Sequence, residues 1–229
     1  MLNIFICHYT KLTERKRHIE EQLSKLKNIK VHFINEYDKE DITEEINDRF
    51  FTFKNYRKVW NERNGYYIKA NEKGRIITLP EKSLCLKHYI ALKKILELNL
   101  DYALVIEDDI EFINNFINRL NIIMKNLPSN WNLYYPGGTK IIKYFFYKKS
   151  IEIDNDYLVK QPHPASLGTY SYLINKNCCQ KIINEMDKNK IRFPIDFEYN
   201  WIFYKLKLNV YFNKRDILIN HIGFKSTIR

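Results

Sequence analysis

Three consecutive acidic residues, Glu107, Asp108 and Asp109, are the most prominent chemical feature of the sequence. They follow the apolar run 102–106, which is typical of a buried parallel strand, and ligands of open α/β sheets bind beyond the carboxyl ends of such strands. On an extended chain, Glu107 and Asp109 project to the same side. Because like charges so close are costly without a cation, one interpretation is a divalent ion that also holds a diphosphate. The alternative is a solvated turn whose acids cap the next helix.

Asp196 and Glu198 are the candidates for a general base. Both follow Pro194 at the predicted start of a helix. A carboxylate in such a position can take the proton of a substrate hydroxyl. It can equally well cap the helix, because acids stabilise helix N-termini. The sequence favours Asp196 as the base, with Glu198 second, and leaves capping open.

Two histidines lie where they could serve a site or only the core. His221 follows the apolar stretch 217–219 near the end of the chain, and a neutral imidazole is a common metal ligand. His88 shares the apolar face of a predicted helix with Leu84 and Ala91. The sequence therefore offers His221 as a metal ligand and His88 as a substrate contact. For each of them a packed core histidine is the alternative.

The composition is that of one globular domain. The chain has 229 residues, of which 45% are apolar and 15% aromatic. This is enough to bury a substantial core and to exclude a wholly disordered protein. The 38 Lys and Arg residues against 27 Asp and Glu give a net charge of +11. Such an excess attracts phosphate-bearing partners, namely nucleotides, nucleic acids and anionic lipid headgroups.

Cysteine spacing and hydropathy bear on the compartment. Cys7, Cys85, Cys178 and Cys179 show neither a C-x-x-C motif nor the spacing of zinc ligands, so we expect buried, reduced thiols. No stretch of the sequence approaches the ~20 consecutive apolar residues of a membrane-spanning helix, and residues 1–14 do not have the pattern of a secretory signal. We therefore expect a cytoplasmic protein, at most in peripheral contact with the inner face of a membrane.

Hydrophobic periodicity predicts the elements that must position these side chains. Strands are expected at 3–7, 31–34, 102–106, 131–135, 168–174, around a turn at 155–156, near 211 and at 217–219. Helices are expected from residue 13, from Ser83 as the N-cap, over 112–127, over 179–186 and over 195–206. The pattern dissolves between 38 and 79, which indicates an irregular insertion or lid within a single domain at 1–229. The strand–helix–strand start predicts an α/β fold with a mixed, mostly parallel sheet flanked by helices.

Several ordered motifs resemble those of glycosyltransferase family 25, the family of bacterial lipopolysaccharide sugar transferases and collagen galactosyltransferases. In chain order they are the first strand with Arg15, Cys85-Leu86-Lys87-His88, the segment from Val105 to Ile110, the segment from Gly168 to Ile174, Pro194-Ile195-Asp196 and the ending through Ser226-Thr227-Ile228. Two departures stand out: Cys7-His8 replaces an Asn-Leu pair of the family, and Lys87 replaces a Ser. The resemblance covers almost the whole chain.

This resemblance implies a glycosyltransferase of the GT-A type, with a Rossmann-like nucleotide-binding half joined to an acceptor-binding half. It implies inverting transfer of a hexose, galactose first and glucose second, from a UDP-sugar with Mn²⁺ or Mg²⁺. The acceptor would be a hydroxyl of a glycan, a lipopolysaccharide or a hydroxylysine-type group. By the same resemblance the metal ligands are Glu107, Asp109 and His221. The implied donor contacts are Cys7, His8, Tyr9, Arg15, His88, Glu107 and Asp108.

The insertion and the basic charge leave further interpretations open. Residues 49–78 interleave basic and aromatic side chains, among them Arg57 and Trp60, and form either a lid that binds the acceptor or a plain solvated lid. A basic nucleic-acid-binding protein is one alternative function. No helix-turn-helix, RRM or zinc motif is present in the sequence, so no nucleic-acid partner is expected. A non-catalytic glycan-binding module is the other alternative.

Overall fold

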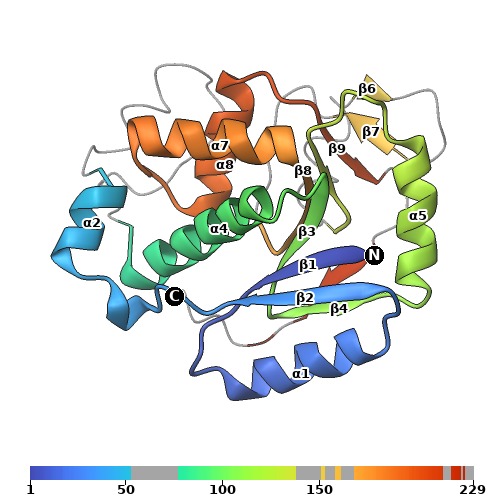
Figure 1. Cartoon of the computed structure of the whole chain (residues 1–229), viewed down its shortest axis with the longest axis horizontal. Helices are drawn as coiled ribbons and strands as arrows, with labels where there is room; N and C mark the ends of the chain where they lie inside the picture. The colour runs from blue at the N-terminus through green and yellow to red at the C-terminus, as the bar shows by residue number, and fades with distance from the viewer. Residues whose placement is uncertain are drawn as a thin grey trace.

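The computed structural model describes residues 1–52, 77–137, 151–152, 158–160, 168–213, 218–222 and 224. Helices cover both faces of a central sheet in this part of the chain (Figure 1). The strands are β1 (Leu2–Cys7), β2 (Ile29–Ile34), β3 (Tyr102–Glu107), β4 (Ile110–Phe112), β5 (Leu133–Tyr135), β6 (Ile151–Glu152), β7 (Leu158–Lys160), β8 (Ser171–Asn175), β9 (Val210–Asn213) and β10 (Ile219–His221). The helices are α1 (Thr13–Ser24), the short 3₁₀ helix η1 (Lys39–Asp41), α2 (Glu44–Phe50), α4 (Leu79–Glu97), α5 (Phe116–Asn126), α7 (Lys176–Asn189) and α8 (Ile195–Lys205).

The main sheet is mixed and mostly parallel, as predicted. Its strand order is β2-β1-β3-β8-β5-β9-β7-β6. Strands β1, β2 and β3 are parallel to one another, and so are β5 and β9. Strand β8 is antiparallel to both β3 and β5, and β7 is antiparallel to both β9 and β6. Within the described sheet, only β8 and β7 therefore run against the common direction.

The first three strands form a Rossmann-like unit that places a binding edge. Strand β1 lies between β2 and β3, and its last residue, Cys7, is in register with Ile34 on one side and Glu107 on the other. Helix α1 covers one face of the sheet and α4 the opposite face (Figure 1). The connection that follows β1 therefore runs over one face of the sheet, and the connection that precedes β3 runs over the other. Such a switch point leaves a crevice where α/β proteins bind ligands.

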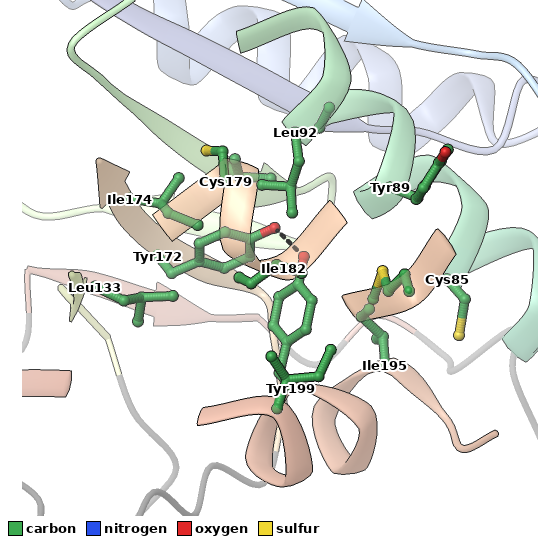
Figure 2. Packing of buried hydrophobic residues seen from close by; sticks show 14 of the residues in the cluster. Cys85, Tyr89, Leu92, Leu133, Tyr172, Ile174, Cys179, Ile182, Ile195 and Tyr199 are labelled. Atoms are coloured by element: carbon green, nitrogen blue, oxygen red, sulfur yellow. Dashed lines mark hydrogen bonds between the residues drawn. The ribbon is translucent and has the colours of Figure 1, made fainter. Parts of the chain in front are cut away.

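Two apolar cores lie on opposite faces of the sheet. One packs strand residues such as Tyr172 against α4, α7 and α8, with Leu92 of α4 in contact with the cluster (Figure 2). The other packs Leu104 against Ile19 of α1 and Leu120 of α5. Burial at both faces explains why β1 and β3 are nearly continuous apolar runs rather than alternating ones.

Helix α4 begins earlier than the sequence predicted, and the assignment of Ser83 as its N-cap is wrong. The cap is Thr78, whose side chain accepts from the Glu81 amide, while the Glu81 carboxylate accepts from the Thr78 amide at 2.9 Å. This reciprocal capping box satisfies two amides that the helix leaves unpaired. Ser83 lies inside the helix, where its hydroxyl donates to the Tyr37 carbonyl at 2.6 Å.

The predicted helix over 112–127 is also wrong at its start. Residues Ile110–Phe112 form β4, which pairs with β10 in antiparallel fashion, and α5 begins only at Phe116. Asn115 precedes the helix with a φ of 60°, a left-handed conformation that Asn tolerates better than most residues. The apolar period runs through both elements, so local periodicity alone could not separate them.

The region predicted as an irregular insertion at 38–79 is partly regular. It begins with η1 and α2, and Thr43 caps α2 by accepting from the Ile46 amide. Phe51, which follows α2, forms an isolated parallel β-bridge with Ile191. Residues 53–76, which include Trp60, lie outside the described part of the structure. Elsewhere the predicted elements are present, with boundaries displaced by a few residues.

Candidate functional site

A pocket lies at the carboxyl ends of β1 and β3. One wall is formed by the acidic segment from Glu107 to Asp109 together with Arg15 of α1. The opposite wall is the first part of α4, including Lys87, and Tyr9 and Lys39 also line the pocket. The pocket therefore occupies the switch point of the sheet, the position at which the sequence predicted a ligand.

Arg15 joins two of the three acids. It is buried in the first turn of α1, on the same helical face as Ile19 and Leu23. Its Nη1 donates to Asp108 Oδ1 at 3.1 Å and to Asp109 Oδ2 at 3.0 Å. A guanidinium between two carboxylates compensates charges that would otherwise repel each other. The acidic segment is thus held by a cation of the chain itself.

His8 completes the contacts of Asp108. Its Nδ1 lies 2.6 Å from Asp108 Oδ2, and because an ionised carboxylate only accepts, Nδ1 carries the proton. Both oxygens of Asp108 are therefore engaged, one by Arg15 and one by His8. His8 is only 1% exposed and is not part of the pocket wall, whereas the neighbouring Cys7 and Tyr9 are.

Asp109 and His221 come together from distant parts of the chain. His221 lies in β10, in register with Ile110, and the Ile222 amide donates to the Asp109 carbonyl at 2.9 Å. His221 Nε2 is 3.3 Å from Asp109 Oδ2. The hydrogen bond to Asp109 raises the pKa of His221 above its ordinary value. In the described residues, the buried Oδ1 of Asp109 has no hydrogen-bond partner.

Glu107 is the third acid, and its geometry differs from the expected one. The extended chain ends at Glu107, and Asp108 and Asp109 form a bend between β3 and β4. The three carboxylates therefore all line the pocket instead of alternating across a strand. Thr169 donates to Glu107 Oε1 at 3.0 Å, and His88 Nε2 lies 3.6 Å from the same oxygen.

His88 lies behind Glu107. It is fully buried, and the pocket wall does not include it. Its Nδ1 is 2.8 Å from the Tyr172 hydroxyl, and the two rings stack with centroids 5.6 Å apart. The structure thus places this predicted donor contact in the core, with its other ring nitrogen toward the carboxylate of Glu107.

The two candidate bases on α8 have different environments. Glu198 is fully buried and accepts from the amides of Arg192 and Phe193 at 2.9 and 3.1 Å, as well as from the Arg192 guanidinium. Burial raises the pKa of Glu198, and Arg192 opposes that effect. The carboxylate is therefore occupied in holding the loop before α8. Asp196 is only partly buried, and Oδ1 accepts from the Phe197 amide.

The environment of Asp196 suits proton transfer near neutrality. Burial raises the pKa of Asp196 from its usual value to about 6, and the negative charge of Glu107 adds to the rise. A general base works best when its pKa lies near the operating pH. Cys7, by contrast, remains a neutral thiol, because burial raises its pKa and Glu107 adds to the effect.

The sequence marked Lys87, which lines the pocket, only as a departure from the family motif, and it missed the buried partner of Lys87, Asp38. Lys87 is 2% exposed, and its ammonium donates to Asp38 Oδ1 at 2.7 Å and to the Glu36 carbonyl at 3.0 Å. Asp38 in turn accepts from the Thr10 amide at 3.2 Å, so this pair ties α4 to the loop after β1. The only available signal was a charged residue beside His88 on an otherwise apolar helical face. A buried partner for it could not be read from the sequence.

The fold and the pocket together define an α/β protein with a charged pocket at the switch point of its sheet. Comparison with known families makes the assignment specific. The model of glycosyltransferase family 25, described as LPS biosynthesis protein, matches residues 1–198. The chain belongs to glycosyltransferase family 25, a family of glycosyltransferase enzymes. The GT-A type fold expected of this family agrees with the observed α/β architecture.

Two curated relatives are similar in sequence. Procollagen galactosyltransferase 1-B of Xenopus laevis is 29% identical over 135 residues, which is 54% of this chain and 20% of the relative. Procollagen galactosyltransferase 1-A of the same organism is 28% identical over 160 residues, 63% of this chain and 24% of the relative. The alignments thus cover about a fifth to a quarter of the length of these relatives.

Two solved glycosyltransferases align with most of this chain at low sequence identity. The galactosyltransferase LgtC in complex with donor and acceptor sugar analogues aligns over 98% of this chain and 88% of its own, with 11% identity and a TM-score of 0.46. A glycosyltransferase involved in glycosylation of the major capsid of PBCV-1 aligns over 98% of this chain and 94% of its own, with 10% identity and a TM-score of 0.47.

None of the helices in the described ranges is long and apolar enough to cross a bilayer.

Proposed function

We propose that this protein transfers a hexose from a UDP-sugar to a hydroxyl of a glycan, lipopolysaccharide or hydroxylysine-type acceptor. The observation that carries the proposal is the pocket at the switch point, where Glu107, Asp108 and Asp109 meet Arg15 in a chain of glycosyltransferase family 25. Galactose is the first candidate for the sugar because both curated relatives are galactosyltransferases. Glucose is the second.

Asp109, which lines the pocket, and His221 beside it fit a divalent ion, Mn²⁺ or Mg²⁺. Asp109 offers the unpartnered Oδ1, and His221 Nε2 lies beside the other oxygen of the same carboxylate. Oxygen and imidazole nitrogen donors suit manganese. No cluster of three or more His, Cys, Asp or Glu able to hold a metal occurs among the described residues. The remaining ligands of the ion would come from the diphosphate of the donor, as is usual for phosphate-bound Mg²⁺.

Asp109 and His221, with Glu107 beside them, would hold the ion. When bound, it supplies a Lewis acid for the negative charge that develops on the departing diphosphate. Arg15 and His8 keep Asp108 and Asp109 in place before the donor arrives. Arg15 also prevents the carboxylates from repelling one another when the pocket is empty. Tyr9 and Lys39 line the pocket wall beside this charged centre and would contact the donor.

Asp196 is the proposed base of an inverting reaction. Inversion requires that the acceptor hydroxyl attack from the face opposite the departing UDP and lose its proton there. A carboxylate with a pKa of about 6 is ionised at neutral pH and can accept that proton. Glu198, the second candidate, has its carboxylate occupied by Arg192 and Phe193. Glu198 therefore supports the loop before α8, the helix that carries Asp196.

A panel of UDP-sugars tests the proposal. The protein should release UDP from UDP-galactose in the presence of an acceptor, and excess chelator should abolish the release while added Mn²⁺ restores it. A non-catalytic glycan-binding module would bind glycans and release no UDP. A nucleic-acid-binding protein would shift DNA or RNA in a salt-dependent manner without divalent ions. Peripheral membrane contact, which the charge of +11 favours, is tested by sedimentation with anionic vesicles.

A further inference from the structure

A buried chain of polar groups leads from Glu107 into the core. His88 Nε2 lies 3.6 Å from Glu107 Oε1, and His88 Nδ1 lies 2.8 Å from the Tyr172 hydroxyl. The Tyr172 hydroxyl is in turn 3.0 Å from the Tyr199 hydroxyl, and this last contact is drawn in Figure 2. The four side chains come from β3, α4, β8 and α8. His88, Tyr172 and Tyr199 have almost no exposed surface.

The protons of this chain can be ordered in two directions, because each hydroxyl has one proton to donate. In the first, Tyr199 donates to Tyr172, Tyr172 donates to His88 Nδ1, and the imidazole proton sits on Nε2, toward Glu107. In the reverse direction the Tyr199 proton has no acceptor among the described residues. The bare Nε2 would then face a carboxylate. Leaving a buried donor unsatisfied is costly. The first direction is therefore favoured, because it pairs both hydroxyl protons and points the Nε2 proton, which has no hydrogen-bond partner among the described residues, at the Glu107 carboxylate 3.6 Å away.

The environment keeps both tyrosines protonated. Burial raises the pKa of Tyr172 and of Tyr199 well above the ordinary value. Both hydroxyls therefore remain protonated donors at neutral pH. The tautomer of His88 is therefore set by two hydroxyls that stay protonated at neutral pH.

The contacts of Glu107 are one-sided. Thr169 Oγ1 and His88 Nε2 both approach Oε1. In the part of the chain that the structure describes, Oε2 has no partner, although Glu107 lines the pocket. A carboxylate held at one oxygen presents the other to a ligand. The distance of 3.6 Å to Nε2 is long for a hydrogen bond, so a small shift of the carboxylate would close it.

We propose that His88 is a positioning residue for Glu107. As the Nε2–H tautomer set by Tyr172 and Tyr199, it holds Oε1 and orients Oε2 toward the nucleotide-sugar. This inference rests on the proposed function for its ligand, while the tautomer itself does not depend on it. A purely structural role would instead require only that the two tyrosine hydroxyls be satisfied in the core.

The tautomer is measured directly by NMR of the whole chain with ¹⁵N-labelled histidine. His88 is assigned by the signals that disappear in His88→Gln. The wild-type protein should show His88 with its proton on Nε2 and with the ¹⁵N shift of a hydrogen-bonded acceptor at Nδ1. In Tyr172→Phe, which removes only the hydroxyl, the Nδ1 signal should move to the shift of a ring nitrogen that accepts no hydrogen bond. A wild-type His88 protonated on Nδ1, or an unchanged Nδ1 shift in Tyr172→Phe, would overturn the inference.

Binding of UDP tests the positioning. Gln at 88 can still place an N–H near Glu107, whereas Asn reaches only toward Tyr172. His88→Gln should keep UDP affinity within about twofold, and His88→Asn and Tyr172→Phe should weaken it by about 3–10-fold, the scale of one hydrogen bond. Tyr134→Phe is the control, because it removes a buried hydroxyl bonded to Asn213 at 2.6 Å outside this chain of groups. Its UDP affinity should not change.

The outcomes separate the inference from the proposed function. Equal loss of affinity in His88→Gln and His88→Asn, or no loss in Tyr172→Phe, would show that His88 does not act through Glu107. Thermal unfolding identifies any variant that fails to fold. If a His88 variant does not fold, Tyr172→Phe still tests the inference, because it removes only a hydroxyl and nearly preserves the side-chain volume. A wild-type protein that does not bind UDP would contradict the proposed function. The tautomer spectra would then decide the assignment of His88 alone.

Discussion

Replacing Arg15 by Met tests whether the pocket depends on its own buried cation. The side chain keeps its length and apolar contacts but loses the guanidinium that bonds Asp108 at 3.1 Å and Asp109 at 3.0 Å. Arg15 is 8% exposed and the two carboxylates are 4% and 8% exposed, so solvent replaces little of the lost interaction. Removing one partner of a buried ion pair costs about 3–5 kcal/mol. For a chain of this size, that lowers Tm by roughly 6–20 °C.

Unfolding by heat and by urea measures the loss, with Arg17→Met as the matched control. Arg17 lies two positions further along α1 and is exposed, so its replacement should change stability by less than about 0.5 kcal/mol. Adding Asp109→Asn to Arg15→Met should cost less than the sum of the single changes, because the neutral amide no longer needs the cation. Equal stability of the two Met variants, or strict additivity in the double variant, would refute the reasoning.

Three further predictions concern the base and the placement of His221. Asp196→Asn should lower kcat by roughly 10²–10⁴ and leave UDP affinity near normal; loss of UDP affinity with normal turnover would move Asp196 to the donor site. Since a base acts in its ionised form, kcat of the wild-type protein should rise with pH through about 6, where the pKa of Asp196 lies; a flat profile between pH 5 and 7 would remove Asp196 as the base. Gly137→Ala should destabilise the protein by about 1–3 kcal/mol and reduce transfer. The added Cβ would lie 2.2 Å from the carbonyl oxygen of Ile219, in the strand that carries His221. Urea unfolding that matches the wild type would contradict this.

The parts of the fold that the sequence predicted are those with strong local signals. The apolar runs of β1 and β3 and the amphipathic period of α1 predicted the first unit, and the acids after β3 predicted the binding edge. These signals are local because burial on both faces demands unbroken apolar strands. The family resemblance was likewise carried by short motifs in the right order, and the family model confirms it.

What the sequence missed depends on contacts between distant residues. No sequence pattern near Phe112 indicates that β4 pairs with β10, more than a hundred residues later in the chain. The pairing of Lys87 with Asp38 and the occupation of Glu198 by Arg192 are equally invisible in local patterns. Thr78 and Ser83 are both good cap residues. Thr78 is the N-cap because Glu81, three residues later, completes a capping box with it.

The most direct test of the central claim is UDP release from UDP-galactose by the wild-type protein and by Asp109→Asn, in the presence of acceptor and Mn²⁺. Asp101→Asn is the control, since Asp101 is an exposed acid just before the opposite end of β3. If the acidic segment binds the donor, Asp109→Asn lowers the rate by at least ~100-fold, the scale of losing one strong electrostatic contact in a transition state, and Asp101→Asn matches the wild type. An Asp109→Asn protein that turns over UDP-galactose at the wild-type rate would contradict the claim.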